Sequence, residues 1–196
     1  MNSRRLACFL LGLWMGGGLL MTWVAAESFS SVDRLLARPH PVATAQFKTL
    51  GRAEARLLLR YQVAEQNRWY FETWEVAQIV IGALFFFFVL FATEENKFAL
   101  FLILLMIAGV VIQRALLTPA IVSLGRLIDF VPPDTSSGEG TQFWVMHSWY
   151  WGVELGKWSL CLGLVARLIS HRRGRSGNAR KEINLVDKAN HRHVNG

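Results

Sequence analysis

The stretch Phe98–Leu117, FALFLILLMIAGVVIQRALL, is almost purely apolar and contains one charged residue, Arg114. A helix needs roughly 17 to 25 mainly apolar residues to cross the hydrocarbon of a bilayer. This stretch is long enough, and three others share its length and composition. We therefore predict an all-α polytopic membrane protein, a four-helix transmembrane bundle formed by residues 1–170. The predicted spans are about 6–26, 74–92, 98–118 and 143–169.

The overall composition agrees with a membrane protein. Apolar residues make up 53% of the chain, with thirteen Phe and eight Trp, which is more than a soluble domain needs. Several tryptophans lie near the ends of the predicted spans, where an indole ring is stable among headgroups: Trp23, Trp69, Trp74, Trp144 and Trp149. Both cysteines, Cys8 and Cys161, lie inside spans, so we expect no disulfide framework.

The net charge of +7 is concentrated in residues 171–196, which follow the last span. This segment has too few apolar residues for a core, so we predict a basic, disordered tail. Together with Arg4 and Arg5, the tail predicts that both termini are cytoplasmic in a multi-pass protein of the cell (inner) membrane. A cleaved secretory signal is the alternative for the first segment.

A basic ridge precedes the second span. Lys48, Arg52, Arg56 and Arg60 recur at every fourth residue, which predicts an amphipathic helix at the membrane edge over about 46–72. The ridge is either a solvated face or a contact with anionic lipid headgroups or an acidic partner. Because neither this ridge nor the tail belongs to a nucleic-acid-binding module, we expect no nucleic-acid partner.

The fourth predicted span is two-faced. Its polar and aromatic face should point into the bundle and meet polar residues of the second and third spans, including a contact between Glu75 and Arg114. Glu154 is either protonated, paired with Lys157 one turn on, or exposed to a wet cavity. The predicted pocket-lining residues are Glu75, Gln78, Arg114, His147, Tyr150, Trp151 and Glu154. On the opposite face, Gly152 and Gly156 are predicted to pack against Gly12 and Gly16.

No catalytic, metal-binding or phosphate-binding motif is present in the sequence. We therefore expect a non-enzymatic protein, without metal or cofactor, that binds or passes a small solute, an ion or a lipid. One alternative is a redox subunit that holds haem or quinone near His147. Another is an accessory subunit of a larger membrane complex, and self-association into a homo-oligomer is a related partner hypothesis.

Three segments carry a resemblance to a known family: LLGLWMGGGLLMTW (Leu10–Trp23), LLTPAIVSLGR (Leu116–Arg126) and FWVMHSWYWGVELGKW (Phe143–Trp158). In these the chain resembles the transmembrane-protein-205-like family of small four-span proteins, which contain a domain of unknown function. The resemblance implies a four-helix membrane bundle and covers the spans, but neither the basic ridge nor the tail. A more distant likeness to copper-resistance membrane domains would imply a histidine in the first span, and this chain has none there.

Overall fold

The computed structural model describes residues 3–92, 97–131 and 138–194, with side chains in the last helix described as far as residue 167. All elements within these ranges are helices, which confirms the all-α class. They are α1 (Ser3–Ala37), α2 (Pro41–Leu50), α3 (Arg52–Ala92), α4 (Lys97–Ile112), the π-helical segment η1 (Gln113–Leu117), α5 (Thr118–Ile128) and α6 (Gly138–Val194).

Three of the described helical segments are long and apolar enough to cross a membrane: Arg5–Ala37, Arg52–Phe91 and Lys97–Ile128. The first and third predicted spans fall within them, and the second does so except for residue 92. The fourth predicted span, 143–169, lies in α6. The described part of α6 is not apolar enough to be counted with the other three segments. Its central region includes Glu154 and Lys157 together with His147 and several tryptophans, and these lower its mean hydropathy.

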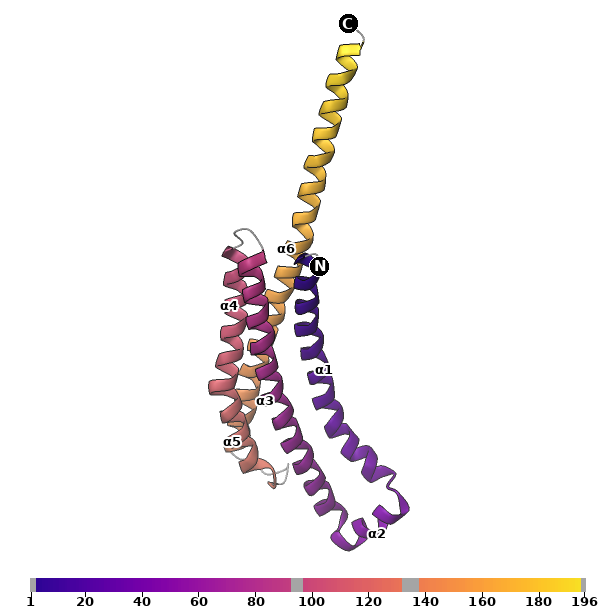
Figure 1. Cartoon of the computed structure of the whole chain (residues 1–196). Helices are drawn as coiled ribbons and strands as arrows, with labels where there is room; N and C mark the ends of the chain where they lie inside the picture. Colours follow the sequence, from indigo (N-terminus) through magenta and orange to yellow (C-terminus); the bar gives the residue numbers. More distant parts are fainter. Residues whose placement is uncertain (1–2, 93–96, 132–137, 195–196) are drawn as a thin grey trace.

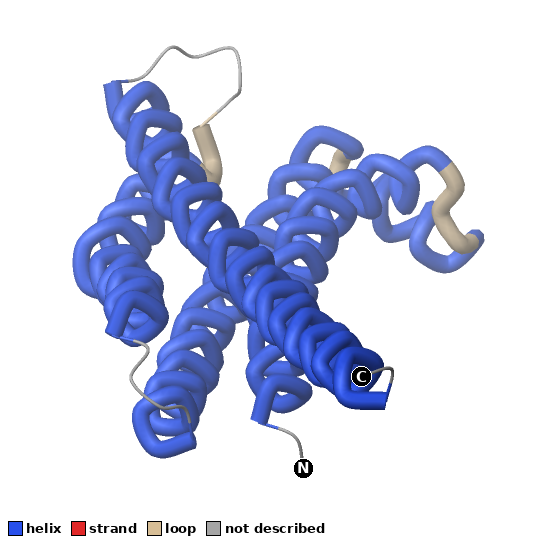
Figure 2. The backbone as a smooth tube through the Cα atoms, turned by 90° about the horizontal axis from the view of Figure 1, so that it is seen from above, coloured by secondary structure: helices blue, strands red, loops and turns tan. Residues whose placement is uncertain are grey.

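The helices α1, α3, α4–α5 and α6 pack alongside one another (Figures 1 and 2). The start of α1, the end of α3, the start of α4 and the continuation of α6 lie at one end of the molecule, and α2 lies at the other (Figure 1). We call the half nearest the N-terminus the terminal half and the opposite one the α2 half. The chain thus enters and leaves the helix assembly at the same end.

Helices α1 and α3 extend beyond the predicted spans. Helix α1 continues to Ala37 rather than ending near residue 26, and α3 begins at Arg52 rather than near residue 74. The expected membrane-edge helix over 46–72 is therefore divided between α2 and the first part of α3, and α3 then continues unbroken into the second span. The division falls at Gly51, whose φ of 89° is in the left-handed region that favours glycine.

Helix α6 continues to Val194, so the structure differs from the prediction of a disordered tail over 171–196. Ala179, Arg180, Lys181 and Glu182 are good helix formers, and no proline follows Gly138. Low apolar content limits tertiary packing, but it does not prevent a helix from continuing. The side chains beyond residue 167, and the loop residues 93–96 and 132–137, lie outside the described part of the chain.

The terminal half is filled by an apolar core to which all the long helices contribute. Trp14 and Leu11 of α1 and Ile103 and Met106 of α4 belong to this core, with exposed fractions of 1–2%. Helix α3 adds residues such as Phe85, and α6 adds Cys161 and Leu164. This packing fixes the four helices against one another on one side of the site described next.

Candidate ligand-binding site

A cluster of buried polar side chains lies next to the apolar core, on the side that faces the α2 half. We call it the polar cluster, and its members are Glu75, Gln78, Gln113, Thr118, Glu154 and Lys157. In α3, in α4–α5 and in α6, these residues separate core positions from positions that line a cavity. The polar cluster therefore marks the boundary between the terminal half and the α2 half.

Lys157 is the centre of the polar cluster. Its Nζ lies 2.6 Å from Glu154 Oε2, so the two form an ion pair. The same ammonium donates hydrogen bonds to Gln113 Oε1 at 2.6 Å and to Gln78 Oε1 at 3.0 Å. All three donor positions of the ammonium are used, which is how a buried lysine offsets the cost of leaving water.

Glu75 forms the second ion pair of the site. Its Oε2 lies 3.6 Å from Arg114 Nη1, and Arg114 also donates to the backbone oxygen of Glu72 at 3.1 Å. The Thr118 hydroxyl donates to Glu75 Oε1. Glu75 is fully buried while Arg114 is partly exposed, so the arginine reaches the glutamate from the outer face of the helices.

A local change of helix geometry brings Gln113 and Thr118 into the cluster. The Thr118 amide donates to Gln113 O, the wider hydrogen bond of a π-helix. Pro119 follows and supplies no amide hydrogen, which disfavours the normal α-helical pairing just before it. As a result, the Gln113 side chain faces α6, where its Nε2 lies 3.2 Å from Glu154 Oε2 and 3.2 Å from the Tyr150 backbone oxygen.

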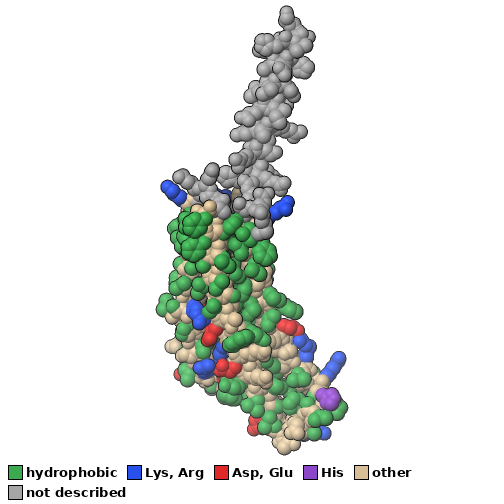
Figure 3. Space-filling view, in the orientation of Figure 1, with side chains coloured by type: hydrophobic (Ala, Val, Ile, Leu, Met, Phe, Trp, Pro, Cys, Tyr) green, Lys and Arg blue, Asp and Glu red, His purple; other side chains and the backbone are tan. Residues whose placement is uncertain are grey.

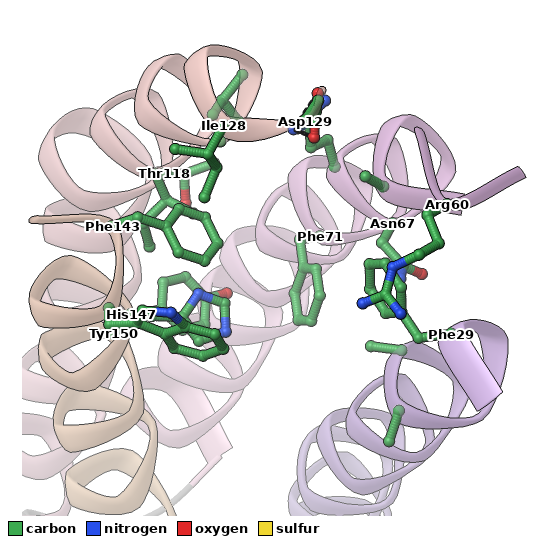
Figure 4. Close-up of a pocket in the computed structure, with 18 of the residues that line it drawn as sticks. Phe29, Arg60, Asn67, Phe71, Thr118, Ile128, Asp129, Phe143, His147 and Tyr150 are labelled. Atoms are coloured by element: carbon green, nitrogen blue, oxygen red, sulfur yellow. Dashed lines mark hydrogen bonds and ion pairs between the residues drawn. The ribbon is translucent and has the colours of Figure 1, made fainter. Parts of the chain in front are cut away.

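A cavity of about 1240 Å³ occupies the α2 half. Its lining comes from α1, α3, α5 and α6 and is mainly apolar and aromatic. Figure 4 shows Phe143 and Tyr150 on one side, Phe29 on the other, and Phe71 between them. Glu154 and Gly18 lie at the end nearest the polar cluster, whereas Arg56 and Arg60 line the end nearest α2.

Polar contacts connect the helices that form the cavity walls. Asn67 Nδ2 of α3 donates to Ser28 Oγ of α1 at 2.9 Å. Arg68 Nη2 of α3 donates to both carboxylate oxygens of Asp129, just beyond α5, at 2.8 Å. The Arg68 and Asp129 side chains are 12% and 9% exposed, so this bidentate pair is well shielded. It joins the wall formed by α3 to the wall formed by α5.

The predicted aromatic and imidazole side chains of α6 line this cavity. The His147 ring stacks on Phe143 with centroids 5.3 Å apart, and His147 Nδ1 is buried without a hydrogen-bond partner among the described residues. Tyr150 meets Phe71 edge to face at 5.9 Å, and Trp151 meets Trp158 at 6.4 Å. Of the predicted site residues, Glu75, Gln78 and Glu154 belong to the polar cluster, and His147, Tyr150 and Trp151 line the cavity. Arg114 belongs to neither group and reaches Glu75 from the outer face.

The two predicted glycine pairs do not meet. Gly12, Gly16, Gly152 and Gly156 are exposed, and a Cβ on any of them would meet nothing within 4 Å. The close approaches occur at neighbouring positions instead. A Cβ on Gly17 would lie 2.1 Å from the Trp74 ring, and one on Gly18 would lie 3.2 Å from Trp158 Nε1. The inward face of α1 therefore includes Gly17 and Gly18, one or two residues after Gly16.

Sequence reasoning did not place Gln113, Thr118 or Lys157 among the pocket residues. On a helical projection at about 100° per residue, Lys157 lies about 80° from His147, so it was not placed on the pocket face. Its long side chain nevertheless turns inward. The local signal that was available is the proline that follows Gln113 and Thr118, since a proline within a span often marks a wider helical turn.

Within the described residues, no group of three or more His, Cys, Asp or Glu side chains is placed to hold a metal ion. Comparison of the chain with protein-family models, with curated proteins and with solved structures gave no match. The resemblance to the transmembrane-protein-205-like family therefore stays a prediction. The function has to be inferred from the polar cluster and the cavity themselves.

Proposed function

We propose that this chain spans a membrane with four helices and binds an apolar, lipid-like molecule in the cavity of the α2 half. The observation that carries this proposal is the cavity itself. It is large, lined mainly by apolar and aromatic side chains, and contains a few polar groups. Such a combination is typical of sites for hydrophobic ligands, in which the polar groups orient the molecule.

The outer surface of the helices supports placement in a bilayer. Hydrophobic side chains cover most of the visible face of the terminal half, and charged side chains gather toward the α2 end (Figure 3). Phe9, Phe87 and Leu104, from three different helices, are each at least half exposed. A soluble monomer rarely exposes so extensive an apolar surface, whereas lipid chains cover it without cost.

Helix α6 is proposed as the fourth span despite its two charged residues. Glu154 and Lys157 face the interior and neutralise each other, so neither charge meets lipid. The exterior face at the same level presents Leu155 and Leu162, which are 53% and 56% exposed. The four spans place both termini on one side, and the basic residues near both termini favour the cytoplasmic side of the cell membrane.

The packing of the terminal half supports binding rather than passage. A solute that crossed the protein would have to go through the polar cluster and then between Trp14, Met106 and Val110, all of which are at most 2% exposed. Opening that route would disrupt a close-packed core. The α2 half, in contrast, already contains the space for a ligand.

The test is retention of a ligand by the purified protein. The protein is prepared in lipid nanodiscs, released gently, and analysed by native mass spectrometry for bound molecules. We expect a retained hydrophobic molecule in the wild type and its loss in Ala25→Phe, because Ala25 lines the cavity and the added ring would fill it.

Ala108→Phe is the matched control. It makes the same change of side chain, but Ala108 is exposed on the outer face of α4 and does not line the cavity. It should retain the molecule as the wild type does. Equal retention by Ala25→Phe and Ala108→Phe would contradict the proposal, as would a wild-type protein that retains nothing.

A further inference from the structure

Most of the charged side chains that line the cavity have a partner of opposite charge. Three ion pairs include them: Arg56–Asp33 at 2.9 Å, Arg68–Asp129 at 2.8 Å and Glu154–Lys157 at 2.6 Å. Arg60 is the exception. Within the described part of the chain, its guanidinium makes neither an ion pair nor a hydrogen bond. The cavity lining therefore contains one positive charge that no carboxylate of the described residues balances.

Arg60 is positioned to meet a ligand at the end of the cavity nearest α2. Its Cζ lies 5.6 Å from the centroid of the Phe29 ring of α1, which also lines the cavity (Figure 4). A guanidinium above an aromatic face keeps its N–H donors available to a further acceptor. Arg60 is also exposed, so an anion bound to it would stay partly hydrated.

The end of the cavity nearest the polar cluster disfavours an anion. Glu154 lines this end, and its carboxylate is already paired with Lys157. A second anion there would add an uncompensated charge to a low-dielectric environment, which is strongly unfavourable. The two ends therefore favour a single orientation of a ligand, with an anionic group beside Arg60 and an apolar part directed inward.

The wall between the two ends has the length and the character that a lipid chain requires. Leu57, Ala64, Phe71 and Trp74 of α3 line it. From Arg60 to Trp74 the helix rises roughly 21 Å at 1.5 Å per residue. One leaflet contains roughly 15 Å of hydrocarbon, half of the bilayer core. A single long hydrocarbon chain therefore fits along α3, within a cavity of about 1240 Å³.

We propose, on the basis of the binding function above, that the ligand is an anionic amphiphile, a long hydrocarbon with a carboxylate or phosphate headgroup. The headgroup accepts hydrogen bonds from Arg60 at the end nearest α2, and the hydrocarbon extends along α3 toward Trp74. Arg56 lies one turn before Arg60 and lines the same end, but Asp33 neutralises it. Asp33 therefore limits the positive charge that the headgroup meets.

The test compares probes of one chain length that differ in the polar group: hexadecanoate, hexadecyl phosphate, hexadecanol and hexadecylamine. Dissociation constants are measured by competition for the full-length protein in nanodiscs of zwitterionic lipid, at a pH that keeps both acids ionised. We expect at least one anion to bind about fivefold or more tightly than hexadecanol, the value of one charge-assisted hydrogen bond at a partly exposed site. The tighter of the two anions identifies the headgroup, and the amine should bind more weakly than the alcohol.

Three variants locate the effect. In Arg60→Gln the preference for the anion over hexadecanol should fall to about twofold or less, while the affinity for hexadecanol stays unchanged because the cavity is intact. Arg52→Gln is the matched control: it removes the same charge from an exposed position of α3 that does not line the cavity, and should keep the preference. Asp33→Asn releases Arg56 and should increase the preference by about twofold, a gain that misfolding would not produce.

Equal wild-type affinities for hexadecanol and both anions would overturn the proposal while leaving the binding function intact. An unchanged preference in Arg60→Gln would also overturn it, as would an equal loss in Arg52→Gln, which would assign the preference to the general surface charge. Inorganic phosphate that displaces hexadecyl phosphate at equal concentration would indicate a site for the anion alone. If no probe binds, the binding function itself is contradicted and not only the choice of ligand.

Discussion

The terminal half and the α2 half are built from the same long helices but are filled in opposite ways. In the terminal half, Leu11, Met106 and Cys161 are at most 1% exposed and the helices close around them. In the α2 half, the same helices enclose a cavity of about 1240 Å³. The change occurs at the polar cluster, where three buried ionic or amide groups meet around Lys157.

This difference indicates what the polar cluster contributes to the fold. A buried ion pair adds little net stability compared with apolar packing, but it specifies which helices meet and at what level. Beyond it, the Trp74 ring lies against α1 at Gly17 and fills the space where a side chain would be. From there α1 and α3 continue together as one wall of the cavity, and α5 and α6 form the other.

The largest expected effect comes from removing the charge at the boundary. Lys157→Met leaves Glu154 buried without its cation and leaves two glutamine oxygens without a donor. Breaking a buried pair in this way typically costs about 3–5 kcal/mol of unfolding free energy. We expect a large loss of thermal stability in detergent and reduced abundance in membranes.

The double variant Glu154→Gln with Lys157→Met sharpens this prediction. Removing both charges should recover part of the stability lost in Lys157→Met, because no unpaired charge remains. Recovery should be incomplete, since Gln78 and Gln113 still lack the ammonium. Additive losses in the double variant would show that the two residues do not form a pair in the folded protein.

Packing should differ between the halves when the same residue type is shortened. Ile103→Ala in the terminal half removes atoms from a side chain that is 1% exposed, and such changes cost about 2–5 kcal/mol. Ile121 lines the cavity, so Ile121→Ala enlarges an existing space and should cost about 1 kcal/mol. Thermal unfolding of the two variants measures the difference. Equal losses would mean that the cavity is packed in solution.

The approach of α1 to α3 gives a smaller effect with a clear control. Gly17→Ala would place a Cβ 2.1 Å from the Trp74 ring, and the resulting displacement should cost about 1–3 kcal/mol. Gly12→Ala, on the exposed face of the same helix, should change stability by no more than about 0.5 kcal/mol. A larger loss at Gly12 would indicate that this face packs against another molecule.

The smallest expected effect concerns the contact between the cavity walls. Asp129→Asn removes the charge that faces Arg68 but leaves Arg68 paired with Glu65 at 2.7 Å. The loss of unfolding free energy should be about 1 kcal/mol. Because the pair joins α3 to the end of α5, hydrogen exchange in α5 should rise while exchange in the terminal half stays unchanged. Uniform acceleration throughout the protein would contradict a local role.

Much of the helical framework could be predicted from the sequence, but the residues at which the helices begin and end could not. Hydropathy identifies the part of a helix suited to lipid and not the helix itself. It therefore placed the end of α1 near residue 26 although the helix continues to Ala37. In the same way it separated residues 46–72 from the second span, although α3 is continuous from Arg52. Polar residues with good helix propensity extend both helices.

The sequence predicted which α6 residues contribute to the site, but not which residues of α1 and of the π-helical segment face inward. A projection at about 100° per residue placed His147, Tyr150 and Glu154 on one face of α6, and the structure has them along the same side. It could not choose between Gly16 and the adjacent Gly17, because the neighbouring helices decide which face is inward. It also assumed a regular helix at Gln113, where the structure has a π-helical segment.

The central claim is that the α2 half contains an open, ligand-accessible cavity while the terminal half is closed. The most direct test is the rate at which N-ethylmaleimide modifies thiols in nanodiscs, in a Cys8→Ser background. The native Cys161 reports on the terminal half, where it is fully buried, and Ala25→Cys reports on the cavity wall.

We expect the thiol introduced at position 25 to react at least about tenfold faster than Cys161, and hexadecanol to slow its reaction by occupying the cavity. Comparable rates at the two positions, or faster modification of Cys161, would contradict the division of the molecule into a closed terminal half and an open α2 half.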